Sequence, residues 1–216
     1  MNRTEVAADS ASPVTRPSSA ANETRLAIIK AAYHAIARSG AQRVSMQEIA
    51  DDAGVSKGLI HYHFDHKGAL VSEALLWALR ATEERVTERL AQGVFSEDPI
   101  TGIVSALFVG PDQNRDFYLT YLDVIDQVAR FPELESFGEM VHDLFEKRFV
   151  TILRRAHASG FIGRDDFENA ATDVRLILDG LFIQWLLTPD WRSQHTCFAL
   201  RCERLLRTVL QDQARA

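Results

Sequence analysis

Hydrogen-bond donors cluster in the segment 45–64, whose sequence is SMQEIADDAGVSKGLIHYHF. Lys57 carries an ammonium group, and His61, Tyr62 and His63 follow it closely. A lysine ammonium can donate to guanine O6 and N7, and polar side chains can bind phosphate oxygens. Placed on one exposed helix, these groups could bind in the major groove of DNA.

Two short helices joined by a tight turn are predicted to position these donors. Ser45 and Glu48 match a capping box that begins the first helix, and Gly54 ends it because glycine enters the left-handed conformation without steric cost. Ser56 then caps the second helix. The apolar positions of the pair are Met46, Ile49, Ala50 and Ala53, then Val55, Ile60 and Phe64. The pattern favours a helix-turn-helix, with a hairpin used only for packing as the alternative.

The flanking segments extend this pattern. One face of a helix upstream consists of Leu26, Ile29, Tyr33 and Ile36. That helix ends near Gly40, and DHKGAL follows the motif at 65–70. With AGVS, HYHF and the later lysine, residues 24–70 resemble the N-terminal domain of TetR-type repressors, the tetracycline repressor family, where the stretch usually reads IA..AGVS.GTLYYHF..K..L. Leu59 stands where threonine is common, and His61 stands where tyrosine is common.

The resemblance implies roles for individual side chains. Lys57, Gly58 and His61 would approach base edges, and Gly58 has no side chain to hold the backbone away from the groove. Leu59 could offer only an apolar contact, for example to a thymine methyl group. The expected phosphate contacts are Ser45, Gln47, Tyr62, His63 and Lys67, and Ser56 completes the DNA-binding set.

The distribution of charge agrees with DNA binding through this segment. The chain has a formal net charge of −6. Residues 24–70 carry six Lys or Arg against four Asp or Glu, a net of +2, whereas residues 71–216 carry a net of −7. Only local charge attracts phosphates, since screening acts over about 8–10 Å. One such domain would bind moderately, and we expect two of them on one double-stranded DNA operator.

The composition is that of a globular protein of 216 residues, with 46% hydrophobic and 25% charged residues. No apolar run is long enough to cross a membrane, and we expect a cytoplasmic location without membrane contact. The two cysteines, Cys197 and Cys202, suggest neither a redox pair nor a disulfide. We expect a disordered tail over 1–21, a DNA-binding domain over 22–70 and a helical effector-binding and dimerisation domain over 71–216.

The periodicity after residue 70 is helical throughout and predicts an all-α chain of about nine helices, in agreement with the resemblance. One face of the helix over 114–130 is expected to consist of Tyr118, Tyr121, Leu122, Ile125 and Val128. Thr196 is expected to cap the last helix, and Asp165 or Asp166 is expected to begin the helix before it.

The helix near 166–187 is apolar around almost its whole circumference, which predicts burial on two sides. A homodimer seam formed with the last helix would cover the second side, and the resemblance implies the same two helices in this role. A well-buried central helix is the alternative. The expected seam residues are Ile177, Leu181, Gln184, Phe198, Cys202, Leu205, Leu206 and Val209.

The remaining helices carry many aromatic residues, which could form the core or line a ligand site between helices. The resemblance implies an effector pocket here for a small apolar or aromatic molecule. The candidate pocket residues are Trp77, Phe108, Phe117, Tyr118, Tyr121, Phe145, Phe149, Phe182 and Trp185. His142, Asp179 and Gln184 are polar candidates that could orient such a molecule.

Other chemistries find little support in the sequence. His61 and His63 point in different directions on a helix, so with His66 they do not form a metal site, and we expect no metal or cofactor. No catalytic motif is present, so we do not expect an enzyme. The sequence predicts a repressor that a small effector releases from a pseudo-palindromic operator. The alternative is a ligand-independent regulator or activator whose C-terminal domain only dimerises.

Overall fold

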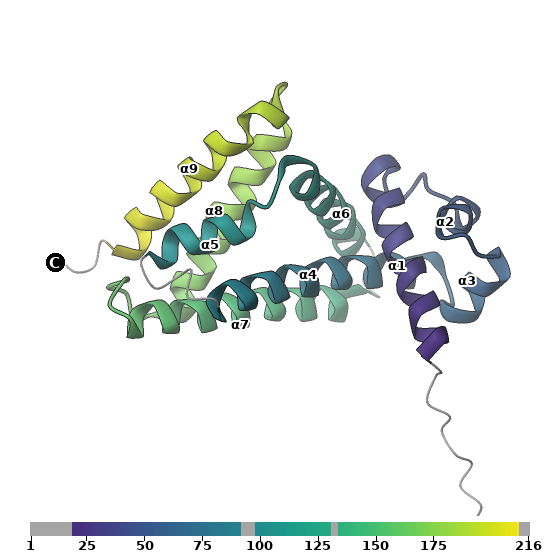
Figure 1. Ribbon diagram of the computed structural model, residues 1–216, viewed down its shortest axis with the longest axis horizontal. Helices are drawn as coiled ribbons and strands as arrows, with labels where there is room; N and C mark the ends of the chain where they lie inside the picture. The colour runs from purple at the N-terminus through teal and green to yellow at the C-terminus, as the bar shows by residue number, and fades with distance from the viewer. Residues whose placement is uncertain (1–18, 92–97, 131–133, 212–216) are drawn as a thin grey trace, which may run out of the picture.

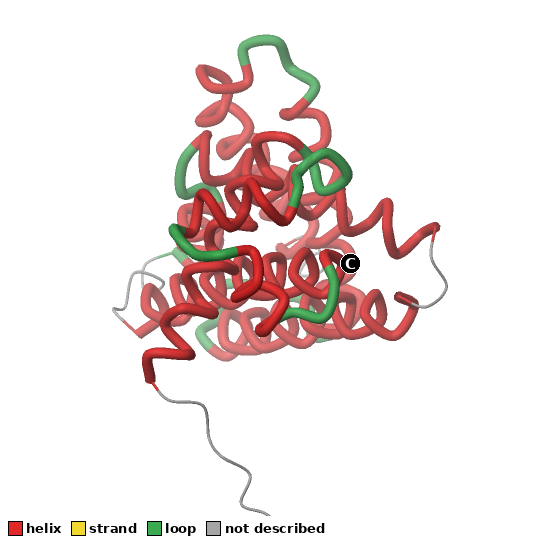
Figure 2. The backbone as a smooth tube through the Cα atoms, turned by 90° about the vertical axis from the view of Figure 1, so that its right-hand side faces the viewer, coloured by secondary structure: helices red, strands yellow, loops and turns green. Residues whose placement is uncertain are grey.

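The structure is a computed structural model that describes residues 19–91, 98–130 and 134–211. Within these ranges every regular element is a helix (Figures 1 and 2). The helices are α1 (Ser19–Ser39), α2 (Met46–Ala53), α3 (Lys57–His63), α4 (Lys67–Ala91), α5 (Pro99–Leu107), α6 (Pro111–Arg130), α7 (Glu135–Ala158), α8 (Phe167–Leu186) and α9 (Trp191–Gln211). The all-α prediction and the expected number of helices are confirmed for the described residues.

Local capping builds the helix-turn-helix as the sequence predicts. Ser45 Oγ accepts a hydrogen bond from Glu48 N at 3.1 Å, and Glu48 Oε2 accepts one from Ser45 N at 2.6 Å. Gly54 ends α2 with φ of 67°, in the left-handed region. Ser56 Oγ accepts from Leu59 N at 3.2 Å and begins α3. The fully buried Ile60 fixes the inward face of α3.

The N-terminal helices α1–α3 pack onto the rest of the chain through α1, which contacts α4 and α6. Figure 1 places α3 at one end of the molecule and the antiparallel pair α8 and α9 at the other. One continuous apolar core extends from Ile28 in α1 to Leu210 in α9. A change in the packing of the C-terminal helices can therefore reach α1 directly.

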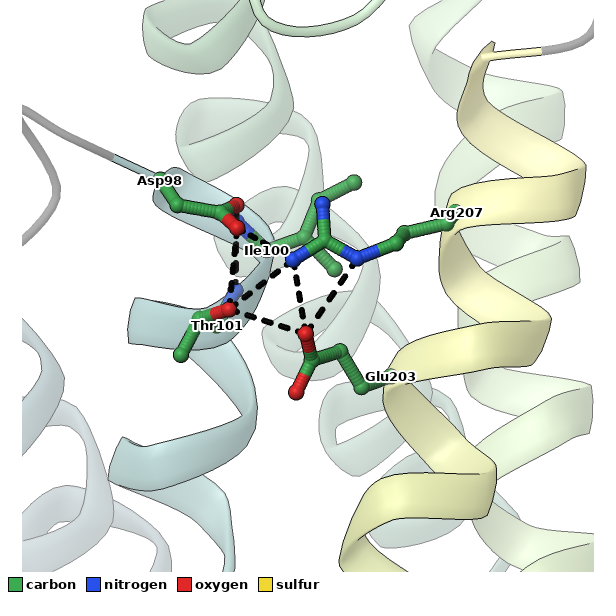
Figure 3. Close-up of polar contacts among 5 residues, drawn as sticks. All are labelled: Asp98, Ile100, Thr101, Glu203 and Arg207. Carbon is green, nitrogen blue, oxygen red and sulfur yellow. Dashed lines mark hydrogen bonds and ion pairs between the residues drawn. The ribbon is translucent and has the colours of Figure 1, made fainter.

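Polar contacts between distant segments also fix the C-terminal helices. Asp98 caps α5, its Oδ1 accepting from Ile100 N at 3.1 Å. Arg207 of α9 donates to Asp98 and to Glu203, and it also contacts the Thr101 hydroxyl at 2.9 Å (Figure 3). The cluster attaches the beginning of α5 to α9.

Two helix boundaries differ from the prediction. Helix α1 begins at Ser19, so residues 19–21 belong to its first turn and not to a tail; residues 1–18 lie outside the described residues. Helix α9 begins at Trp191, and Thr196 lies within it. The Trp185 indole donates to the Trp191 carbonyl at 2.5 Å, and this tertiary contact, which joins the two helices at a tight corner, could not be derived from a capping pattern.

The buried face of α6 also differs in one position. Tyr118 and Tyr121 are buried as expected, but the next buried residue is Val124, while Ile125 is 42% exposed. A shift of one residue rotates a helix face by about 100°, because a turn takes 3.6 residues.

Among the described helices, none is long and apolar enough to cross a membrane.

Candidate DNA interface and ligand cavity

The outer surface of α3 exposes the predicted base-contacting residues. Lys57, Gly58 and His61 are exposed, and no described residue forms a hydrogen bond or ion pair with the side chain of Lys57 or His61. A Cβ placed on Gly58 would meet only Ser56 Oγ, at 3.9 Å, so the protein's own packing does not require glycine there. This surface can therefore approach another molecule closely, and its donors remain available for acceptors on that molecule.

The neighbouring polar residues surround this surface. Tyr62 is 79% exposed, and its ring lies edge-on to His63, with centroids 5.1 Å apart. The hydroxyl groups of Ser45 and Ser56 accept capping bonds but keep a proton to donate. Gln47 donates to Asp51 Oδ1 at 2.8 Å. Leu59 is only half-buried and could still offer an apolar contact.

Lys67 is the first residue of α4 and follows the helix-turn-helix in the sequence. Its side chain extends back to the turn before α2. Its Nζ donates to the Gln42 carbonyl at 3.2 Å. An ammonium has three donors, so this bond positions the charge near α2 and leaves donors for a phosphate. Two other cations of the domain are paired with acids: Arg25 Nη2 lies 3.1 Å from Glu73 Oε1, and Arg38 Nη2 lies 2.6 Å from Asp52 Oδ2.

A cavity of about 190 Å³ lies between α1, α4, α5, α6, α7 and α8. Six of the predicted pocket residues line it, namely Trp77, Phe117, Tyr118, Phe145, Phe149 and Phe182. Its wall is mostly apolar, with aliphatic side chains from α4, α5, α7 and α8 completing it. Such a composition is typical of a site for a small organic molecule.

Three predicted pocket residues do not line this cavity. Phe108 stacks on Phe182, with ring centroids 4.6 Å apart, and faces a groove between α5 and α9. Tyr121 accepts a hydrogen bond from Arg175 Nη2 at 2.9 Å, on the side of α8. Trp185 is fully buried in the corner between α8 and α9. Aromatic type and helical spacing do not distinguish a residue that lines a cavity from one that fills the core.

The polar part of the cavity was not predicted. Arg85, Arg148 and Asp116 line it, together with Tyr33 and His34 from α1. Burial raises the pKa of Asp116, against the opposing effect of His34, whose Nδ1 lies 3.6 Å from the carboxylate. Tyr33 was identified only as an apolar-face residue of α1, and no local pattern connects it to helices that follow much later in the chain.

The polar residues named as candidates to orient an effector lie outside this cavity. His142 and Asp179 both contact Arg175: the His142 ring lies 3.3 Å from its Nη1, and Asp179 Oδ2 lies 3.5 Å from its Nε. Gln184 is exposed on α8. These side chains therefore belong to the surface and to the contacts between α6, α7 and α8.

Exposed apolar side chains lie on both α8 and α9. Leu176, Ile183 and Leu187 follow one face of α8 and its C-cap. Leu205 is exposed on α9, whereas Leu200 of the same helix borders the groove beside α5. Four residues expected at a dimer seam are instead buried inside the protomer, namely Leu181, Phe198, Cys202 and Leu206. Their apolar stripe packs on the protomer's own core: Cys202 and Leu206 have no exposed surface, and Leu181 and Phe198 keep only 8% and 7%. Ile177, Gln184, Leu205 and Val209 keep partial or full exposure.

No group of three metal-binding side chains occurs among the described residues. His66 Nδ1 accepts a hydrogen bond from Ala69 N at 3.1 Å, so this histidine caps the start of α4. The arrangement assigns His66 a structural contact and leaves His61 on the outer surface of α3.

Known protein families match the chain over both its N-terminal and its C-terminal part. Residues 28–74 match the family model for bacterial regulatory proteins of the tetR family, and residues 96–213 match that for the C-terminal part of BetI-type transcriptional repressors. The chain is 36% identical to the transcriptional regulator AcrR of Shigella flexneri, over 79% of this chain and 81% of that protein. It is 29% identical to TtgR of Pseudomonas putida, over 82% and 87% respectively.

Solved structures share the fold. A transcriptional regulator from Saccharomonospora viridis, solved in complex with choline, superimposes with a TM-score of 0.72 at 23% identity, covering 89% of this chain and all of that one. A TetR-family regulator from Rhodococcus sp. gives a TM-score of 0.69 at 22% identity, over 86% and 99%. The family matches together span both the helix-turn-helix and the helices that enclose the cavity, and the chain belongs to the TetR family of bacterial transcriptional regulators.

Proposed function

We propose that the protein is a homodimeric repressor that binds a pseudo-palindromic operator through α3 and is released by a small apolar or aromatic effector. The observation that carries the DNA-binding part is the exposed surface of Lys57, Gly58 and His61, whose donors have no described partner in the protein. A short helix held from behind by a buried Ile60 can enter a major groove without rearrangement.

Dimerisation would use the outer face of α8 and α9. Leu176 and Leu187 are 68% and 74% exposed, and Ile183 lies on the same face of α8 with 40% exposure. Exposed apolar side chains that align along one helix face favour an isologous contact with a second copy. Two copies would present two α3 helices, as a two-fold symmetric operator requires.

Release by an effector is supported by the position of the cavity. Tyr33 and His34 of α1 form part of its wall, so a ligand there would contact the DNA-binding domain itself. Asp123 of α6 also accepts a hydrogen bond from Ala41 N at 2.7 Å, just after α1. A ligand that favours one position of α1 over another would shift the population away from the DNA-binding arrangement. The choline bound to the Saccharomonospora viridis regulator offers a precedent for a small ligand on this fold.

The DNA-binding part is tested by selecting binding sites from random DNA with the wild type and with Lys57→Ala. The variant should bind the selected operator about 1–3 kcal/mol more weakly and lose its base preference at one position of each half-site. Lys147→Ala, which removes an exposed lysine on α7, serves as the matched control and should keep both. Identical selected sites for wild type and Lys57→Ala would show that Lys57 does not contact a base.

A test of the effector response distinguishes the proposed effector-released repressor from a ligand-independent regulator. Phe149→Ala should lose the effector's effect on operator binding while it keeps the affinity for the operator, because Phe149 lines the cavity from α7, whereas the DNA-binding surface is on α3. A protein whose operator affinity responds to no small molecule would instead be the ligand-independent regulator.

A further inference from the structure

A glycine interrupts the exposed apolar face of α8. Gly180 lies one turn after Leu176 and one turn before Ile183, and Leu187 follows two turns after it. These four positions fall within a sector of about 60° around the helix axis, since each residue advances by about 100°. All four are exposed. The face therefore has large side chains on both sides of one position where the backbone itself is uncovered.

The fold of the protomer does not require a glycine at this position. A Cβ added to Gly180 would meet no described atom within 4 Å. Gly180 also lies outside the set of glycines with positive φ, which are Gly40, Gly54 and Gly160. Glycine inside a helix is less favourable than alanine, because it loses more backbone freedom on folding. A close contact with another molecule at this face supplies a reason for a residue that local stability disfavours.

The packing of α8 leaves this face open to a second helix. Helix α8 contacts α7 and α9, and its inward side chains, among them Val174, Leu178 and Trp185, are buried in the core. The axes of packed helices lie about 8–10 Å apart, depending on the side chains at the contact. Because Gly180 has no side chain, a helix that crosses α8 at this point can approach to the short end of that range.

The same face is complementary to its own copy. In a two-fold contact, residue i of one copy meets residue j of the other, and j meets i. Leu176 precedes Gly180 by four residues and Ile183 follows it by three. When two antiparallel α8 helices cross at Gly180, Leu176 of each copy therefore faces Ile183 of the other. A second copy of this chain supplies the matching surface without any further requirement.

The area of the contact also favours a close crossing of two copies. Helix α8 has 20 residues, so its outer face is about 30 Å long and about 10 Å wide, or about 300 Å² per copy. Two such faces give about 600 Å², half of the roughly 1,200 Å² at which specific interfaces begin. Helix α9, with 21 residues, packs beside α8 and offers a similar area. Both helices of each copy reach the partner only when the α8 helices lie close together.

We propose that Gly180 is the point at which α8 crosses the α8 helix of a second copy, with the two backbones in close contact there. Leu176 of each copy then packs against Ile183 of the other. The inference rests on the proposed homodimer and names the contact at its centre. It makes Gly180 a residue that assembly requires and that folding of the protomer does not.

Disulfide cross-linking of the full-length protein tests the crossing point directly. Gly180→Cys and the control Leu187→Cys are each made in a Cys197→Ser background, because Cys197 is an exposed thiol. A disulfide needs Cα atoms about 4.4–6.8 Å apart, which a close crossing provides for the two copies of residue 180. Leu187 lies about 10 Å further along the helix, where crossing helices have diverged. Oxidation should give covalent dimers at position 180 only. Equal cross-linking at 187, or none at 180, overturns the crossing point.

A bulky side chain at the same position tests its role in assembly. Gly180→Leu should raise the dissociation constant of the dimer by at least about tenfold, because extra volume in a packed contact is destabilising. Circular dichroism should show a folded protomer, since the space around the added side chain is open. Thr172→Leu adds an apolar side chain at an exposed position about 12 Å away on the same helix and should leave the constant unchanged. A Gly180→Leu dimer as tight as the wild type overturns the proposal.

Sedimentation of the wild type separates this inference from the proposed homodimer. A monomeric wild type overturns both. A wild-type dimer that Gly180→Leu leaves intact, and that does not cross-link through position 180, overturns the crossing point and leaves the homodimer in place. A wild-type dimer that Gly180→Leu separates into folded monomers, and that cross-links through position 180, supports both.

Discussion

The two ends of the molecule are stabilised by contacts of very different range along the chain. In the helix-turn-helix, the capping bonds Ser45–Glu48 and Ser56–Leu59 each join residues three positions apart. Among the C-terminal helices, the contact between Asp98 and Arg207 joins residues 109 positions apart. The first kind of contact is visible in a sequence pattern, and the second exists only once the chain has folded.

The functional surfaces follow the same division. The DNA-binding surface is one face of one short helix, and its residues lie next to each other in the sequence. The cavity takes its wall from six helices, beginning with Tyr33 in α1 and ending with Phe182 in α8. We therefore expect substitutions on the exposed face of α3 to act on DNA binding alone, and substitutions in the C-terminal helices to act on assembly, stability or ligand binding.

The largest effect is expected at the outer face of α8. Ile183→Glu would place an unpaired charge in the proposed dimer seam and should cost several kcal/mol of dimer stability, while the protomer stays folded because Ile183 is already 40% exposed. Sedimentation should then give monomers, with weakened operator binding. Met140→Glu, a similarly exposed position on α7, should remain a dimer. A folded dimer of Ile183→Glu would place the seam elsewhere.

A buried residue of the last helix gives the contrasting result. Leu206 has no exposed surface, so Leu206→Arg should unfold the protomer and not merely separate two folded copies. Circular dichroism distinguishes the two outcomes. A folded monomer of Leu206→Arg would mean that this residue faces the partner after all.

A smaller effect is expected from the contact between α5 and α9. Arg207→Met should lower the free energy of unfolding by about 1 kcal/mol near neutral pH, because the contact is partly exposed and screened by water. The control is Arg130→Met in the exposed i,i+4 pair with Asp126, where the loss should stay below about 0.5 kcal/mol. Equal losses in urea titrations would show that the long-range contact contributes no more than a local one.

The pH dependence of this contact follows from the pKa of Asp98. Burial raises that pKa, but hydrogen bonds from Arg207 and Thr101 outweigh it and lower the pKa below its ordinary value of 3.8. The stabilisation is therefore complete above pH 3.8 and is lost as the pH falls through the lowered value. The difference in stability between wild type and Arg207→Met should shrink over that acid range and stay constant above it.

The smallest effect is expected at Lys67. Lys67→Ala should weaken binding to all DNA sequences alike and reduce the salt dependence of binding by about one charge per N-terminal domain. Its bond to the Gln42 carbonyl predicts only a minor loss of stability, since the contact is exposed. An unchanged slope in a salt titration would rule out a phosphate contact by this residue.

Where sequence-based prediction succeeded, one local requirement determined each residue. Gly54 has the left-handed conformation that the turn needs, and Ser45 and Ser56 cap the helices they precede. It failed where two faces of one helix are both apolar. Periodicity identified Leu181 and Leu206 as apolar-face residues but did not show whether the face meets the protomer's own core or a second copy. That choice depends on which other helices pack there.

The sequence by itself determined the helix-turn-helix with its donors and the all-α character of the chain, because caps, turns and helical periodicity depend on residues only a few positions apart. The tertiary structure alone decided which aromatic residues enclose the cavity, that Arg85 and Asp116 form its polar end, and that Tyr33 of the first helix belongs to it. These residues meet only because α1 packs across α4 and α6, and such packing depends on the shapes of all three helices together.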